Sequence, residues 1–206
     1  MTPLQCYIAF ALAAGVLTVT PGLDTALVLR TTVVDGRRRA LETMLGIVAG
    51  CCVWGTVASI GLGALLAVSS IAYDAMRIAG AIYLCWLGLR MLARPRDAVF
   101  AMTDRGKGGG WFLRGLLTNL LNPKVGVFYV TFLPQFVPAG YPVVATSLAF
   151  TLIHAAEGAL WLGALACAAG SLGSWLRRPA VVRSLDRLTG AVLVAFGLRL
   201  ALERGR

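Results

Sequence analysis

Asp24, Lys124, His154 and Glu157 lie within the longest apolar stretches of the chain, which are otherwise nearly uncharged. Charged groups are costly inside a membrane, so they persist mainly where they line a cavity, bind a solute or carry protons. A carboxylate and an ammonium group could also bind the two oppositely charged ends of an amino acid. These residue types therefore favour a binding site for a small charged solute within the membrane.

Two of these charges belong to short motifs that contain proline. They are Thr20-Pro21-Gly22-Leu23-Asp24 and Asn122-Pro123-Lys124. Threonine or asparagine before proline is typical of a helix start, because the polar side chain caps the first turn and proline fits its first position. Each motif therefore predicts that one half-helix ends and another begins. The two amino ends would face one central site, where free N–H groups suit a carboxylate and Asp24 could hold an ammonium group.

The composition indicates an all-α integral membrane protein. Of the 206 residues, 58% are hydrophobic, and the mean hydropathy is +0.79. A membrane-spanning helix needs about 20 consecutive apolar residues. Four stretches clearly meet this requirement and two are weaker, so we expect six transmembrane helices, with five as the alternative. The stretches are residues 4–29, 43–68, 71–93, 115–136, 143–172 and 180–202.

The net charge of +10 is better explained by membrane topology than by binding to nucleic acid. Basic residues cluster after the first, third and fifth stretches, whereas the loop at 138–142 has none. The positive-inside rule makes the three basic loops cytoplasmic. Both termini would then face outward, although Arg199, Arg204 and Arg206 near the carboxyl end oppose this orientation.

The two halves of the chain resemble one another. Arg77-Ile-Ala-Gly80-Ala81 matches Arg187-Leu-Thr-Gly190-Ala191, and Pro21 and Pro123 lie at a similar offset. Halves with an odd number of helices must run in opposite directions through the membrane. The repeat therefore predicts a 3+3 inverted arrangement, with helices 1 and 4 broken at Pro21 and Pro123. Its parts would be residues 1–103, a cytoplasmic linker at 104–110, and residues 111–206. Chance similarity between glycine-rich and alanine-rich helices is the alternative.

The charged residues each have a structural alternative. Asp24 and Lys124 could contact a substrate, or they could form a permanent ion pair that only joins the two halves. His154 and Glu157 share one helix face with Trp161, so they could relay protons or contact the substrate. A basic amino acid would need a second carboxylate, and Glu157 is the candidate for it. Both residues could equally be hydrogen-bonded groups that stabilise the fold.

Two other sets of residues indicate architecture rather than chemistry. Gly46 and Gly50 form a small-xxx-small face for close helix packing. The cysteines show no metal-ligand spacing, so we expect thiols buried in the lipid-facing parts of the helices. They are Cys6, Cys51, Cys52, Cys85 and Cys167.

The chain resembles the LysE/RhtB family of amino-acid exporters over nearly its whole length. The resemblance rests on Thr-Pro-Gly-x-Asp at 20–24, Asn119-Leu-Leu-Asn122-Pro123-Lys124 and the stretch at 132–136, although the family's usual second proline is Leu23 here. It implies export of amino acids or related metabolites across the bacterial inner membrane, driven by the proton gradient or the membrane potential. It also adds Asn119 to the substrate-binding set, which becomes Thr20, Pro21, Gly22, Asp24, Asn119, Asn122, Pro123 and Lys124.

Other functions fit the sequence less well. A divalent metal-ion exporter would have only Asp24, His154 and Glu157 as scattered ligands. A non-transporting membrane scaffold would leave the helix breaks without a ligand. We expect no enzymatic activity, no cofactor and no bound metal. The expected partners are an amino-acid substrate and membrane lipid, and a homodimer is compatible with the sequence.

Overall fold

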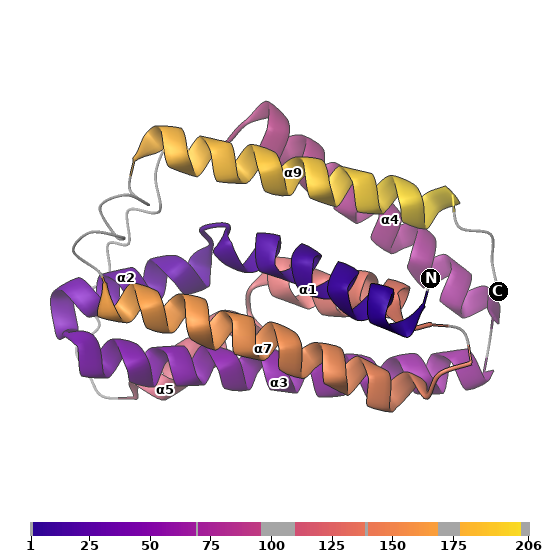
Figure 1. The fold of residues 1–206 in the computed structure, drawn as a ribbon, viewed down its shortest axis with the longest axis horizontal. Helices are drawn as coiled ribbons and strands as arrows, with labels where there is room; N and C mark the ends of the chain where they lie inside the picture. Colours follow the sequence, from indigo (N-terminus) through magenta and orange to yellow (C-terminus); the bar gives the residue numbers. More distant parts are fainter. Residues whose placement is uncertain (1, 69, 96–109, 139, 169–177, 203–206) are drawn as a thin grey trace.

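The structure, a computed structural model, describes residues 2–68, 70–95, 110–138, 140–168 and 178–202 (Figure 1). Every regular element in these ranges is a helix, as predicted. The predicted linker lies outside the described residues except for Gly110. The elements are α1 (Pro3–Val19), α2 (Leu23–Asp35), α3 (Arg37–Val68), α4 (Ser70–Ala93), α5 (Trp111–Leu120), α6 (Pro123–Val127), the π-helix η1 (Phe128–Phe132), the 3-10 helix η2 (Leu133–Phe136), α7 (Val143–Cys167) and α9 (Pro179–Leu202).

Two helical segments are broken where the prolines predicted it. The axes of α1 and α2 differ by 51°, and those of α5 and the helical segment Pro123–Phe136 differ by 55°. Asn122 caps α6 as expected, because its side-chain oxygen accepts a hydrogen bond from the Lys124 N–H at 3.1 Å. The prediction for Thr20 is wrong. Its hydroxyl donates to Val16 O at the end of α1, at 2.7 Å, and Gly22 is the residue that precedes α2.

Four of the six predicted spans are supported within the described residues. Arg37–Gly61 and Val143–Cys167 are each long and apolar enough to cross a membrane, and each bent pair could make one further span. The remaining two segments, α4 and α9, do not reach this criterion. In α9 the reason is that Asp186, Arg187 and Arg199 shorten its uncharged run. The six-span arrangement therefore stays a prediction.

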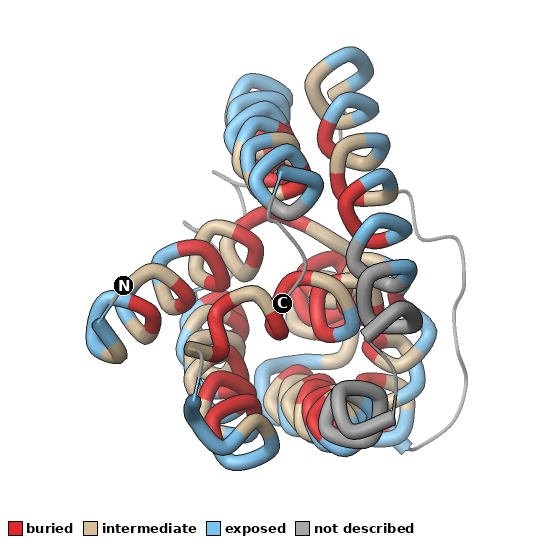
Figure 2. Tube along the Cα trace, turned by 90° about the vertical axis from the view of Figure 1, so that its right-hand side faces the viewer, coloured by how far each residue is buried: buried red, intermediate tan, exposed pale blue. Residues whose placement is uncertain are grey.

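Glycines set the closest helix contacts. A Cβ atom built on Gly46 of α3 would overlap Phe112 O of α5, and one built on Gly50 would lie 2.6 Å from Asn119 Oδ1. The helices α4 and α9 meet in the same way, since a Cβ on Gly88 would lie 2.6 Å from Gly190 O. The predicted small face at Gly46 and Gly50 therefore contacts α5. Figures 1 and 2 place the α4 and α9 pair on one side of α1 and the α3 and α7 pair on the other.

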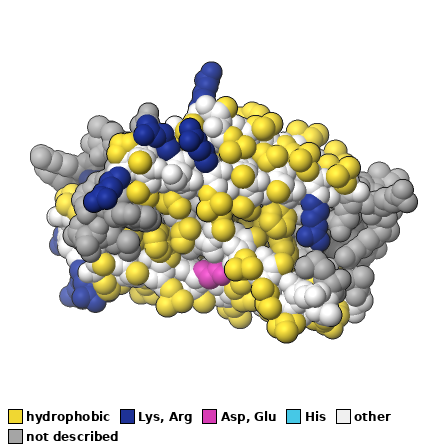
Figure 3. All heavy atoms as spheres, turned by 45° about the horizontal axis from the view of Figure 1, so that its top comes forward, with side chains coloured by type: hydrophobic (Ala, Val, Ile, Leu, Met, Phe, Trp, Pro, Cys, Tyr) yellow, Lys and Arg dark blue, Asp and Glu magenta, His cyan; other side chains and the backbone are white. Residues whose placement is uncertain are grey.

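The surface and the charged ends are those of a membrane protein. Large apolar side chains are exposed along the helices, including Leu12 at 69% and Leu160 at 76%, and hydrophobic atoms cover much of the face in Figure 3. Two predicted cytoplasmic segments meet at one end of the bundle. There Arg39 and Arg114 lie 5.6 and 5.0 Å from the centroid of the Trp111 ring. The two segments therefore lie at the same end of the bundle, and the side of the membrane that this end faces stays a prediction.

The core consists of two clusters of buried side chains (red in Figure 2). The larger one is rich in aromatic residues and joins α1, η1, η2 and α7 with single or paired residues of α3, α4, α6 and α9. The smaller one is aliphatic and joins α2, the start of α3 and the end of α7.

Candidate functional site

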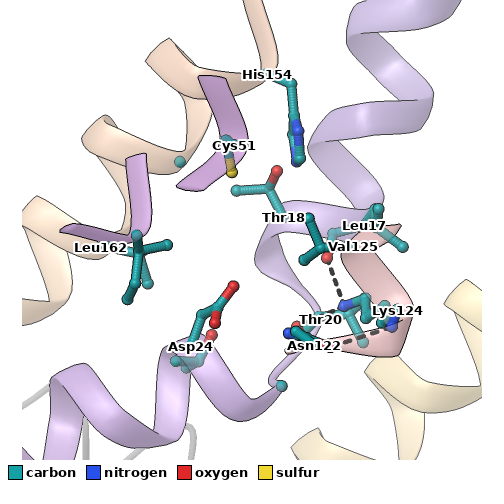
Figure 4. Close-up of a pocket in the computed structure, with 14 residues that line it drawn as sticks. Leu17, Thr18, Thr20, Asp24, Cys51, Asn122, Lys124, Val125, His154 and Leu162 are labelled. Carbon is teal, nitrogen blue, oxygen red and sulfur yellow. Dashed lines mark hydrogen bonds between the residues drawn. The ribbon is translucent and has the colours of Figure 1, made fainter. Parts of the chain in front are cut away.

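The two helix breaks line one shared pocket of about 50 Å³. The pocket lies between α1, α2, α3, α6 and α7, and Figure 4 shows the side chains that surround it. Six of the residues singled out in the sequence line this pocket: Thr20, Gly22, Asp24, Asn122, Lys124 and His154. The expectation that both breaks face a common cavity therefore agrees with the structure.

Asp24 presents one bonded and one unbonded carboxylate oxygen. Oδ2 accepts a hydrogen bond from Asn119 Nδ2 at 2.9 Å. Oδ1 is buried and has no hydrogen-bond partner among the described residues, and the same holds for the Thr18 hydroxyl on the pocket wall. Buried polar atoms are nearly always partnered, so the pocket has two positions where a polar ligand would complete the bonding.

Lys124 binds the backbone at the end of α1. Its Nζ donates to Leu17 O at 2.9 Å and to Thr20 O at 3.2 Å. These carbonyl oxygens lie at the carboxyl end of a helix, which is the end that favours a cation. Lys124 therefore holds the first break in place, and its charge also lies close to Asp24.

Replacing Lys124 with methionine is expected to destabilise the protein by about 3 kcal/mol, because two backbone carbonyl groups lose charge-assisted hydrogen bonds inside the membrane. The measurement is thermal unfolding of detergent-purified protein. Exchanging the two charges, Asp24→Lys with Lys124→Asp, should not restore stability, since a carboxylate cannot donate to carbonyls. Arg38→Met is the control, because that side chain is 95% exposed. Full recovery in the exchanged variant would instead favour a simple ion pair.

The amino ends of the two half-helices are not equivalent, which corrects the expectation of two free helix starts. The first turn of α6 is capped by Asn122. Gly22 has no side chain with which to cap α2. The start of α2 is therefore the end with uncapped N–H groups, and a Cβ built on Gly22 would lie 3.8 Å from Lys124 Nζ.

His154 and Glu157 have different surroundings despite sharing a helix. His154 lines the pocket, and its Nδ1 is hydrogen-bonded to the Tyr129 hydroxyl at 2.9 Å. Glu157 is not among the residues that line this pocket and faces α1, where a Cβ on Gly15 would lie 3.8 Å from Oε1. Its other oxygen, Oε2, is buried without a hydrogen-bond partner among the described residues.

Three further residues belong to the site and were not identified from the sequence. Cys51 lines the pocket, where its Sγ accepts a hydrogen bond from Asn119 Nδ2 at 3.5 Å, so the expectation of a lipid-facing thiol is wrong at this position. Tyr129 is fully buried against His154. Thr18 lines the pocket close to the break. A cysteine, an aromatic residue and a threonine in apolar sequence give no local signal of a site.

No group of three or more His, Cys, Asp or Glu side chains among the described residues is placed to hold a metal ion. Asp24 and His154 line the pocket, and Glu157 lies outside it. The metal-exporter alternative therefore gains no support from the geometry.

Comparison with known proteins relates the chain to translocators and efflux proteins. A family model described as LysE type translocator matches residues 16–204. The threonine efflux protein of Escherichia coli (strain K12) is 30% identical over 98% of this chain and 100% of its own length. The homoserine/homoserine lactone efflux protein of Salmonella typhi is 27% identical over 97% and 98%. An uncharacterized membrane protein of Bacillus subtilis (strain 168) is 27% identical over 97% and 100%. No solved structure gives a significant match.

Proposed function

The chain belongs to the LysE type translocator family, and on that premise we propose that it exports amino acids across the bacterial inner membrane. The observation that carries the proposal is the buried Asp24 Oδ1, which faces the pocket without a hydrogen-bond partner among the described residues. An α-ammonium group would supply that partner and neutralise the carboxylate.

A neighbouring part of the pocket suits the carboxylate of the same substrate. The uncapped start of α2 offers N–H groups, and the Lys124 charge lies beside Gly22. Together they favour a carboxylate beside Gly22, while Asp24, in the first turn of α2, favours the ammonium group. An amino acid would therefore bind with both charged groups paired, which also prevents transport of simple cations or anions.

The remaining wall favours a small uncharged side chain. Leu17, Ile47, Val125 and Leu162 supply apolar surface. A basic substrate would need a second carboxylate, and Glu157 is the one that the sequence offered for this purpose. Because Glu157 does not line the pocket, we assign the site to neutral amino acids, in keeping with relatives named for threonine and homoserine efflux.

Export through such a site fits an inverted repeat. The repeated segments of α4 and α9 pack antiparallel, since Gly88 lies against Gly190 and a Cβ on Gly197 would lie 2.9 Å from Ala81 O. In the sequence repeat Gly80 corresponds to Gly190 and Gly88 to Gly197, so the two contacts are related by exchange of the halves. This relation supports the part of the proposal in which a two-fold axis in the membrane plane relates the two halves. It also supports alternating access of the pocket to the two sides of the membrane.

We assign proton coupling, as a further part of the proposal, to Glu157. A carboxylate in the membrane with an unpartnered oxygen is stabilised by binding a proton. Its place between α1 and α7 would let protonation change the packing of the first broken helix. His154, bonded to Tyr129, has a separate role in this scheme.

The experiment is threonine counterflow and efflux in vesicles that contain only this protein, with an amino-acid competition panel. L-threonine, L-homoserine and L-serine should compete, and L-lysine and L-glutamate should not. An imposed pH gradient should drive net efflux, and Glu157→Gln should abolish that acceleration while retaining threonine counterflow. Stronger competition by lysine would overturn the neutral-substrate assignment. Efflux driven only by a membrane potential would overturn proton coupling, and absence of transport for the whole panel would contradict the function.

A further inference from the structure

Phenylalanine side chains form a compact layer on one side of the pocket. Phe10 stacks on Phe150 at 4.6 Å between ring centroids and meets Phe136 edge-on at 5.4 Å, and Phe128 stacks on Phe132 at 5.0 Å. All five are at most 4% exposed. We call these five residues the aromatic barrier. Closely packed aromatic rings exclude water and oppose the passage of a polar solute.

The aromatic barrier lies on the side of the pocket away from the basic segments. Phe10 precedes the first break by half of α1, and Phe128 to Phe136 follow the second break. Under the positive-inside topology this side faces the exterior. In the proposed transport cycle the barrier would therefore be the closed extracellular gate.

His154 lies at the boundary between pocket and barrier. Its ring packs on Phe128 at 4.7 Å between centroids, while the same residue lines the pocket. Its Nδ1 bonds to Tyr129, which belongs to the π-helix η1 together with two of the barrier phenylalanines. Short π-helical turns are uncommon and occur often at functional sites.

Polar contacts also hold the Asp24 side of the pocket. Asn119 Nδ2 donates to Asp24 Oδ2 at 2.9 Å and to Cys51 Sγ at 3.5 Å. These bonds join α2, α3 and α5, whereas the bond between Tyr129 and His154 joins η1 and α7.

The Tyr129 O–H can donate to His154 Nδ1. This assignment requires the neutral histidine tautomer with its hydrogen on Nε2. Losing the Tyr129 hydroxyl would therefore leave the His154 ring without the bond that fixes its orientation beside Phe128.

We propose that Tyr129 is a positioning residue that holds His154 against Phe128 and keeps the aromatic barrier closed in the absence of substrate. This inference rests on the proposed function, because it treats the pocket as the substrate site. His154 itself lines the pocket, so a substrate bound there would contact its ring, weaken the bond between Tyr129 and His154, and shift the gate toward its open state.

The test measures access to the barrier from outside. The thiol introduced by Leu133→Cys, at a fully buried position in the same core cluster, is labelled in right-side-out vesicles with a membrane-impermeant reagent. Peptide mass spectrometry quantifies the labelling of each cysteine separately. Adding L-threonine should accelerate labelling. Without threonine, Tyr129→Phe should accelerate labelling about five-fold, because losing one hydrogen bond shifts a two-state equilibrium by about that factor. Threonine should then cause no further acceleration in this variant.

Tyr7→Phe is the matched control. Tyr7 packs on the barrier residue Phe150 at 4.8 Å, so the variant also removes one tyrosine hydroxyl next to the barrier. Its labelling should equal that of the parent. Equal labelling of the Tyr129 and Tyr7 variants would overturn the inference, as would a parent that transports threonine with no change in labelling. If the parent transports no threonine, the substrate assignment fails, and the Tyr129 and Tyr7 comparison still tests the gate.

A double-mutant cycle separates the hydrogen bond from general loosening of the core. His154→Asn removes the other partner of Tyr129. If their contact is what closes the barrier, the double variant should label no faster than about the faster single variant. Multiplied effects, roughly 25-fold from two independent five-fold changes, would overturn the proposal.

Discussion

Asp24→Asn is expected to reduce the initial rate of L-threonine efflux from reconstituted vesicles by roughly 10- to 100-fold, the range expected for losing a charge-assisted hydrogen bond to the substrate ammonium group. The fold should survive this change. The asparagine side-chain oxygen can still accept the hydrogen bond that Asn119 gives to Asp24 Oδ2. The loss should therefore be in transport, with an unchanged thermal unfolding midpoint.

Glu42→Gln is the matched control for that experiment. It also converts a carboxylate in the first half of the chain to an amide, but Glu42 is 44% exposed and pairs with Arg38 on the same helix. Its efflux rate should stay within about two-fold of the parent, because exposed ion pairs contribute little. Parental efflux by a well-folded Asp24→Asn protein would remove Asp24 from the binding site.

The positions of the helix breaks were predictable because the signals are local. Proline removes a backbone donor and cannot continue a helix, and a polar residue beside it in apolar sequence is costly unless it caps a helix or lines a cavity. Pro21 and Pro123 therefore marked both breaks. The detail at Thr20 was not predictable, since a threonine before proline can cap the helix before it or the helix after it. The choice depends on where the chain bends.

The composition of the pocket depended on tertiary contacts that no local pattern contains. Cys51 lies in α3, and only the close approach of α5 at Gly50 brings Asn119 to its thiol. Glu157 and His154 are three residues apart and were expected to work together. Three residues are less than a full helical turn, so the two side chains point about 60° apart, and His154 meets Tyr129 while Glu157 meets α1. The spacing of His154 and Glu157 predicted that they share a helix face, but not which elements pack against that face.

Gly46→Ala is expected to destabilise the protein by about 3 kcal/mol and to reduce threonine transport with it. A Cβ atom at Gly46 would overlap Phe112 O, and one at Gly115 would overlap Thr43 O, so α3 and α5 touch through glycines on both sides. The obstacle is backbone, which cannot rotate away as a side chain can. The methyl group must therefore push the two helices apart.

The loss of transport follows from where the separation acts. Asn119 is on α5 and is completely buried, and its Nδ2 bonds to Asp24 on α2 and to Cys51 on α3, so pushing α5 away from α3 displaces Asn119 from the site. Gly61→Ala in the same helix α3 is the matched control, because nothing lies within 4 Å of a Cβ built there. That variant should melt at or above the parental temperature, since alanine favours helix over glycine. If the two variants melt alike in detergent, the contact between α3 and α5 does not set the geometry of the site.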